Sequence, residues 1–174
     1  MQAYWLALHV WLLHSKQHLV QRDEGVFGSA LCALVTRRLF EWQWSRIRLW
    51  LHAADVPIMS ITNELQDMQE FIFGLCVALD DAFKEEAASG TLHALMMDEQ
   101  EFGDSAIGLA PRVKYALWAN VYSGNVPHEA PHLHELTVYL LRQRVMLEAL
   151  ARGSFFMCQF DWAEFPYPRS TPMQ

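Results

Sequence analysis

Long stretches of helical periodicity, interrupted at only a few points, constrain the fold of this chain more than any other feature. Apolar residues recur every three or four positions, the spacing that places them on one face of an α-helix. No strand-like alternation of useful length is visible in the sequence. The expected helices cover residues 3–21, 26–53, 62–88, 110–123 and 131–152. We therefore predict an all-α fold, a single bundle of about five long helices around one core.

Turn and capping residues set the expected ends of the first three helices. Asp23-Glu24-Gly25 should break the chain between the first and second helices, with the glycine as a helix stop. Asp55-Val56-Pro57 should end the second helix, because proline lacks an amide donor. Ser60 or Thr62 would cap the third helix, and Glu64 would complete a capping pattern.

Later boundaries are set by proline and glycine as well. Pro111 fits the first turn of its helix, and Gly153 should close the last long helix. Residues 89–108 are ambiguous: a short helix near residues 92–97 is expected, followed by an acidic loop insert. Residues 153–174 are expected to form a mostly extended tail.

The apolar stripes of the helices predict specific core positions. Leu75, Leu117 and Leu140 each lie on the apolar stripe of a different predicted helix and should be buried in one bundle. In the first helix the stripe contains Leu8, Trp11, Leu12, Ser15 and Leu19, so Lys16 and Gln17 should lie off it. His9 sits within an apolar run and is expected to be a hydrogen-bonded core histidine.

Length and charge limit the classes of protein that fit. With 174 residues and 52% hydrophobic residues, the chain suits one globular domain over residues 1–174 and is not disordered. The net charge of −7 argues against specific nucleic-acid binding. The acidic excess is concentrated in residues 53–110, where one lysine and twelve acids give −11. Residues 1–52, with six basic residues and three acids, carry +3.

Targeting signals and disulfides are not evident. The apolar runs 3–13 and 71–79 are too short for a transmembrane helix, which needs about 20 residues. The first residues do not resemble a signal peptide or a transit peptide, and an upstream segment removed by processing is compatible with this beginning. Cys32, Cys76 and Cys158 are too widely spaced for a disulfide scaffold or a cysteine zinc site.

Candidate catalytic and metal sites are weak. Residues 128–132 spell H-E-x-x-H, but Pro131 interrupts the helix that this zinc motif requires. His14 and His18 are four residues apart on a helix, yet no third ligand is evident from the sequence. No nucleophile elbow, phosphate-binding loop or dinucleotide motif is present. We expect no catalytic residue, metal or cofactor, and we keep a hydrolase or metalloenzyme only as a remote third interpretation.

Tryptophan and arginine in the second predicted helix are the more informative residues. Trp42 and Trp44 are separated by about 200° around a helix, so they cannot face the same neighbour. Trp and Arg dominate interface hot spots. We therefore expect Trp42 or Trp44, with Arg46 and Arg48, to contact a partner protein. The competing interpretation is a central helix that buries both tryptophans.

Several segments, in order along the chain, resemble the ubiquinol–cytochrome c chaperone family. The resemblance begins with the residues LHVWLL at positions 8–13 and continues with the long second helix and its following loop, residues 27–56. It extends to QEFIFGLCVALDDAF at 69–83, ALWANVYSG at 116–124, YLLRQRVMLEAL at 139–150 and FDWAEF at 160–165. No single motif is catalytic, and the ordered set carries the resemblance.

The sequence departs from the family at its surface. Trp42 and Trp44 replace acidic residues that the family tends to carry, and Leu49 stands where an acid is expected. The acidic insert at residues 98–104 is unusual, and the family's helix before Leu8 is not seen. These changes affect surface residues more than the core periodicity.

The resemblance implies a non-enzymatic chaperone in mitochondria, at the matrix side of the inner membrane. Such proteins bind newly made cytochrome b, with a small assembly-factor subunit, during the biogenesis of respiratory complex III. The partner-binding residues expected here are Trp11, Trp42, Trp44, Arg46 and Arg48. The alternative is a permanent subunit of a large mitochondrial complex (a respiratory complex, ATP synthase or the mitoribosome), because obligate interfaces are more hydrophobic than transient ones.

Overall fold

The structure, a computed structural model, describes residues 2–90 and 110–162. The side chains of residues 2 and 22–29 are outside this description. The described residues are helical with connecting turns and contain no strand, so the predicted all-α class is confirmed. The chain divides into two compact units, Met1–Ala78 and Leu79–Gln174, which are described separately below. A single domain over residues 1–174 stays a prediction.

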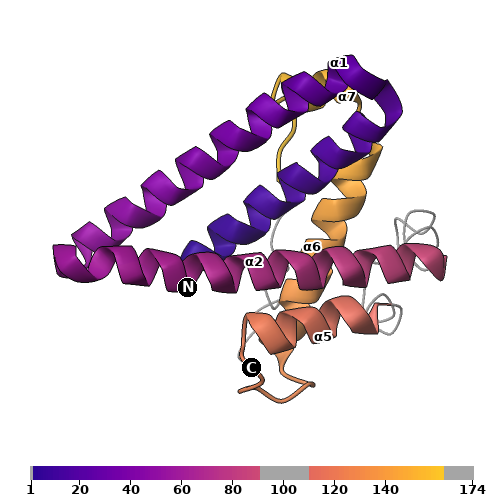
Figure 1. The fold of residues 1–174 in the computed structure, drawn as a ribbon. Helices are drawn as coiled ribbons and strands as arrows, with labels where there is room; N and C mark the ends of the chain where they lie inside the picture. The colour runs from indigo at the N-terminus through magenta and orange to yellow at the C-terminus, as the bar shows by residue number, and fades with distance from the viewer. Residues whose placement is uncertain (1, 91–109, 163–174) are drawn as a thin grey trace, which may run out of the picture. The chain divides into compact units, whose positions relative to one another are not determined.

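The first unit is built on α1, Gln2–Ala53, which folds back on itself (Figure 1). A straight helix of 52 residues would be about 78 Å long. Instead, the Thr36 hydroxyl donates a hydrogen bond to Gln17 Oε1 at 2.5 Å, although the two residues are 19 positions apart. The His14 and Phe40 rings also meet, with 5.6 Å between centroids. Residues 2–21, the first arm, therefore run antiparallel to residues 30–53, the second arm.

The turn between the arms differs from the sequence prediction. Helical structure continues through Asp23, Glu24 and Gly25, so the predicted break in the helix is wrong. The reversal of direction predicted between two separate helices is nevertheless present, as a bend within one helical element (Figure 1).

The start of α2, Ile58–Ala88, also corrects a prediction. The Pro57 carbonyl accepts hydrogen bonds from the amides of Ser60 and Ile61, at 2.8 and 3.2 Å. Ser60 and Thr62 therefore lie inside the first turns and are not the N-cap. Pro57 directly precedes the helix and supplies the first accepting carbonyl, and its own missing amide is not needed at this position.

The core of the first unit joins both arms of α1 to α2. Ala7, Ile47 and Ile72 are its buried centre. Around them pack the partly buried residues Ala3, Leu6, Trp44, Trp50, Leu51, Leu65, Met68, Phe71 and Cys76. Leu75 is only 1% exposed, which confirms its predicted burial. This packing fixes which side of the second arm faces inward.

Two residues expected off the apolar stripe of the first arm are buried, and this expectation was wrong. Lys16 and Gln17 are 7% and 1% exposed. For Gln17 the reason is the fold-back of α1, which places Thr36 and Cys32 against it. The Cys32 thiol lies 3.7 Å from the Gln17 carbonyl oxygen and can donate to it, and burial raises the thiol's pKa. The apolar stripe of one helix predicts only one buried side, so it does not predict the burial of a second side of the first arm.

The second unit contains α5, Pro111–Asn120, and α6, Pro131–Ala149, which pack against each other. Each begins with proline, as the first-turn preference predicts. Leu117 and Leu140 have no exposed surface, which confirms them as core residues. Between the helices, the Trp118 indole N–H donates to the Val126 carbonyl at 2.7 Å and holds the connecting loop.

The last turns of α2 belong to this unit and are tied to the start of α5. Glu86 is 4% exposed, and its Oε1 accepts the Arg112 backbone N–H at 3.2 Å. Glu85 pairs with the Arg112 guanidinium. A carboxylate at a helix N-terminus accepts amides that have no partner within the helix and complements the helix dipole.

The C-terminal prediction is partly wrong. Gly153 does not close a helix, because α6 ends at Ala149 and a short helix, α7, covers Arg152–Phe156. Phe155 is buried, which explains why this stretch of the supposed tail is ordered into a turn of helix. The predicted short helix at 92–97, the acidic loop and residues 163–174 of the tail lie outside the described residues.

Candidate functional site

One side of the second arm of α1 is solvent-exposed and rich in apolar residues. Leu31, Leu34, Trp42 and Leu49 are 42%, 52%, 52% and 56% exposed. At 100° per residue around the helix axis, these four residues and the exposed residues Arg38 and Ser45 all lie within a sector of about 80°. We call this surface the outer face: Leu31, Leu34, Arg38, Trp42, Ser45 and Leu49. Its positions repeat every three or four residues, as anchors for a partner would.

The two tryptophans of this arm are divided between core and surface. Trp44 packs on the core centred on Ile47, whereas Trp42 is half exposed on the outer face. The sequence-based inference that they cannot share one neighbour is confirmed. The central-helix interpretation, in which both are buried, is wrong for this structure. A row of exposed apolar side chains, on a helix whose opposite side packs on the core, indicates an interaction site.

The charges beside the outer face are mostly positive. Arg37, Arg38, Arg46 and Arg48 are exposed, and Glu41 is the one acid between them. Arg38 pairs with Glu41 at 3.1 Å, an exposed ion pair that contributes little to stability. The second arm thus presents leucine and tryptophan bordered by guanidinium groups, which suits an apolar partner segment that carries acidic residues.

Arg48 also lines a groove between the second arm and α2. The groove has a volume of about 520 Å³ and is lined by Arg48, Thr62, Leu65, Gln66, Gln69 and Glu70. The lining contains one cation (Arg48), one carboxylate (Glu70) and one leucine. The other three residues carry hydroxyl or amide groups. A partner lying on the outer face could place polar side chains into this groove.

Trp11, the remaining predicted contact residue, is not on the surface. Its side chain is 2% exposed, so it belongs to the buried stripe of the first arm and the expectation that it contacts a partner is corrected. It lies at the spacing of the buried residues Leu8, Leu12 and Ser15, which are on the same side of the first arm. Trp42, Arg46 and Arg48 are accessible, whereas Trp44 packs on the core beneath the same arm.

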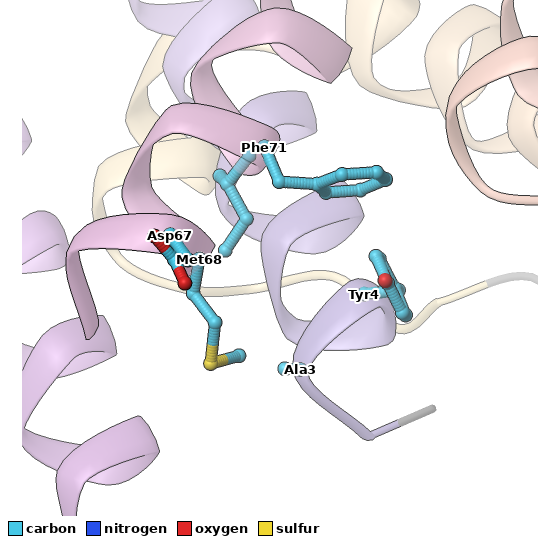
Figure 2. Close-up of a pocket in the computed structure, with 6 residues that line it drawn as sticks. Ala3, Tyr4, Asp67, Met68 and Phe71 are labelled. Atoms are coloured by element: carbon cyan, nitrogen blue, oxygen red, sulfur yellow. The ribbon is translucent and has the colours of Figure 1, made fainter. Parts of the chain in front are cut away.

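A second, smaller pocket lies where the beginning of α1 meets the middle of α2 (Figure 2). It has a volume of about 200 Å³ and is lined by Ala3, Tyr4, Asp67, Met68, Phe71 and Ile72. Figure 2 shows the Met68 and Phe71 side chains projecting from α2 towards the first turns of α1. The Tyr4 and Phe71 rings meet edge to face, with 5.0 Å between centroids.

Several histidines pack against neighbouring aromatic or imidazole rings. The H-E-x-x-H motif is not on one helix, because α6 begins only at Pro131. His128 stacks on the Trp118 ring with 4.3 Å between centroids, and His14 meets His18 edge to face at 4.4 Å. Among the side chains that the structure describes, no group of three His, Cys, Asp or Glu residues is arranged to hold a metal ion.

His9 is the histidine whose surroundings the sequence predicted. It is half-buried, and its Nδ1 lies 2.7 Å from the Trp5 carbonyl oxygen, to which it donates. Burial lowers the pKa of His9, and the hydrogen bond opposes this shift. His9 is thus a hydrogen-bonded residue at the edge of the core, as expected.

The leucines of the outer face and the pocket at Asp67 were not predicted from the sequence. Leu31, Leu34 and Leu49 could have been found from their spacing relative to Trp42, because the same three- and four-residue rule applies to an exposed stripe. The pocket could not have been found in this way. It depends on which turn of α1 meets which turn of α2, a contact between residues more than 60 positions apart.

Comparison with known proteins identifies the family. The family described as ubiquinol-cytochrome C chaperone matches residues 1–110, which include α1, α2 and the whole outer face. No curated protein and no solved structure gives a significant match. None of the described helices is long and apolar enough to span a membrane. Because the match covers more than half of the chain, this protein belongs to the ubiquinol-cytochrome C chaperone family, and its role is of the chaperone type.

Proposed function

We propose that this protein is a non-enzymatic chaperone for the assembly of respiratory complex III. It acts in mitochondria at the matrix side of the inner membrane and binds newly made cytochrome b or a small assembly-factor subunit. Family membership supports the chaperone role. The observation that carries the binding proposal is the exposed Trp42 on a row of leucines, within the residues that match the family.

The outer face has the chemistry that a client segment of a membrane protein requires. Such a segment is mostly apolar and needs an apolar surface until it is inserted. Leu31, Leu34, Trp42 and Leu49 provide this surface, and they follow the spacing used when one helix lies along another. Arg46 and Arg48 beside them would select clients or partners that carry carboxylates near the apolar segment.

Trp42 is the expected hot spot of this contact. It is large, it is half exposed in the isolated chain, and partner burial would remove its remaining apolar surface from water. Truncating a hot-spot tryptophan costs about 2 kcal/mol or more, which corresponds to roughly 30-fold weaker binding. Trp44 would contribute indirectly, because it packs on the core beneath the same arm.

The test compares three alanine variants in affinity purification from the native source. Trp42→Ala should keep its folding stability and lose the co-purified cytochrome b or small partner. Phe73→Ala removes an aromatic ring that is 71% exposed on α2 and is not part of the outer face, and it should leave both unchanged. Trp44→Ala should mainly lower thermal stability. Full partner recovery with Trp42→Ala, in the folded protein, would contradict the proposed surface.

A permanent subunit of a large mitochondrial complex is the second candidate. The four large apolar side chains of the outer face favour it, because obligate interfaces are more hydrophobic than transient ones. Native mass measurement of the endogenous complex distinguishes the two. A chaperone should be found in assembly intermediates below one copy per complex, and a subunit should be found in the mature complex at a fixed ratio.

A further inference from the structure

We propose that the pocket lined by Ala3, Tyr4, Asp67, Met68, Phe71 and Ile72 receives an arginine side chain of a partner protein. This site is separate from the outer face and has the opposite charge. The inference goes beyond the proposed function, since a partner with an exposed arginine could bind here whether or not cytochrome b binds the second arm.

Pocket size indicates one side chain rather than a cofactor. The volume of about 200 Å³ is below the roughly 300–1,000 Å³ of most small-molecule sites. A single long side chain fits such a space. Ala3, Met68 and Ile72 form apolar walls, and Ile72 is itself 4% exposed, so the bottom of the pocket is part of the core.

The aromatic pair gives the pocket a fixed wall. Tyr4 and Phe71 lie on different helices, and their ring planes are 74° apart with 5.0 Å between centroids. This edge-to-face arrangement is the favoured geometry of an aromatic pair and restrains both rings. A guanidinium group stacks well on such rings, and arginine is the cation most often found there.

Asp67 supplies the charge that an arginine requires. Its carboxylate lines the pocket, is exposed, and has no ion pair within the described part of the chain. From Ile58 to Ala78, α2 carries three acids and no lysine or arginine, so the local field is negative. The aliphatic stem of arginine would cover the apolar walls while its guanidinium reaches the carboxylate. An acidic side chain would be repelled.

The proposal can be tested by NMR with small probes and the full chain. N-acetyl-arginine amide should shift the backbone amide signals of Ala3, Tyr4, Phe71 and Ile72 in a saturable way. N-acetyl-citrulline amide, a neutral analogue of nearly the same shape, should bind about tenfold more weakly, because it loses the ion pair and the cation–π contact.

Matched variants complete the test. Asp67→Asn should weaken arginine binding about fivefold, whereas Asp80→Asn, an exposed acid further along α2, should not. If N-acetyl-norleucine amide binds as tightly as the arginine probe and Asp67→Asn has no effect, the pocket takes an apolar side chain and the proposal is overturned. Uniform, unsaturable shifts over all acidic surfaces also overturn it. The outer-face variant Trp42→Ala should leave arginine binding unchanged, which separates this proposal from the proposed function.

Discussion

Replacing Gln43 by leucine should make the protein more stable. Gln43 has no exposed surface, and among the described residues neither its amide nitrogen nor its amide oxygen has a hydrogen-bond partner. It shares a side of the second arm with Thr36 and Ile47, which meet the first arm and the core. An unsatisfied buried polar group costs about 1–3 kcal/mol. Leucine has a similar size and brings no polar atom, so most of this cost should be recovered.

The expected gain for Gln43→Leu is about 1–3 kcal/mol in the free energy of unfolding by urea. For a chain of this length, each kcal/mol raises Tm by roughly 2–4 °C. Gln17→Leu is the matched control: Gln17 is also buried and its Nε2 has no partner among the described residues, but its Oε1 accepts the Thr36 hydroxyl at 2.5 Å. Removing that acceptor leaves the hydroxyl unpaired, so little net gain is expected. A destabilising effect of Gln43→Leu, or an equal change in stability in both variants, would show that the Gln43 amide is not an uncompensated buried group.

Two further predictions concern the core and its response to pH. Leu75→Ala and Leu117→Ala should each lower the free energy of unfolding by about 2–5 kcal/mol, since both side chains are fully buried; losses below about 0.5 kcal/mol at both sites would contradict the packing. Burial lowers the pKa of His9 in the folded state, so the unfolded chain binds more protons and stability should fall as the pH drops below its ordinary value of 6.5. His9→Leu should therefore lose less stability than the wild type between pH 7.5 and pH 5.5 in urea titrations, and equal losses would count against this assignment.

Local patterns were sufficient for much of the fold. The all-α class, the proline starts of α5 and α6 and the burial of Leu140 follow from spacing and backbone chemistry that act within one or two turns. The separation of Trp42 from Trp44 likewise follows from helix geometry alone.

Features that depend on contacts between distant residues were not predictable in this way. The bend that keeps α1 helical through Gly25 and the burial of Gln17 depend on pairing between its two arms. The pocket at Asp67 depends on the register of α1 against α2. The start of α2 differs from the prediction for a local reason, because the Pro57 carbonyl accepts the first amides and the capping pattern at Ser60 lies inside the helix.

Site-specific crosslinking from the outer face tests directly whether this surface binds a client during the assembly of complex III. A photoreactive residue at Ser45, which is exposed between Trp42 and Leu49, should capture newly made cytochrome b or a small assembly-factor subunit during mitochondrial translation. The same residue at Asn63, exposed on α2, should not. The Ser45 crosslink should form early and disappear as complex III matures. Crosslinks that persist in a mature complex at a fixed ratio, or no crosslink from Ser45, would contradict the proposed role.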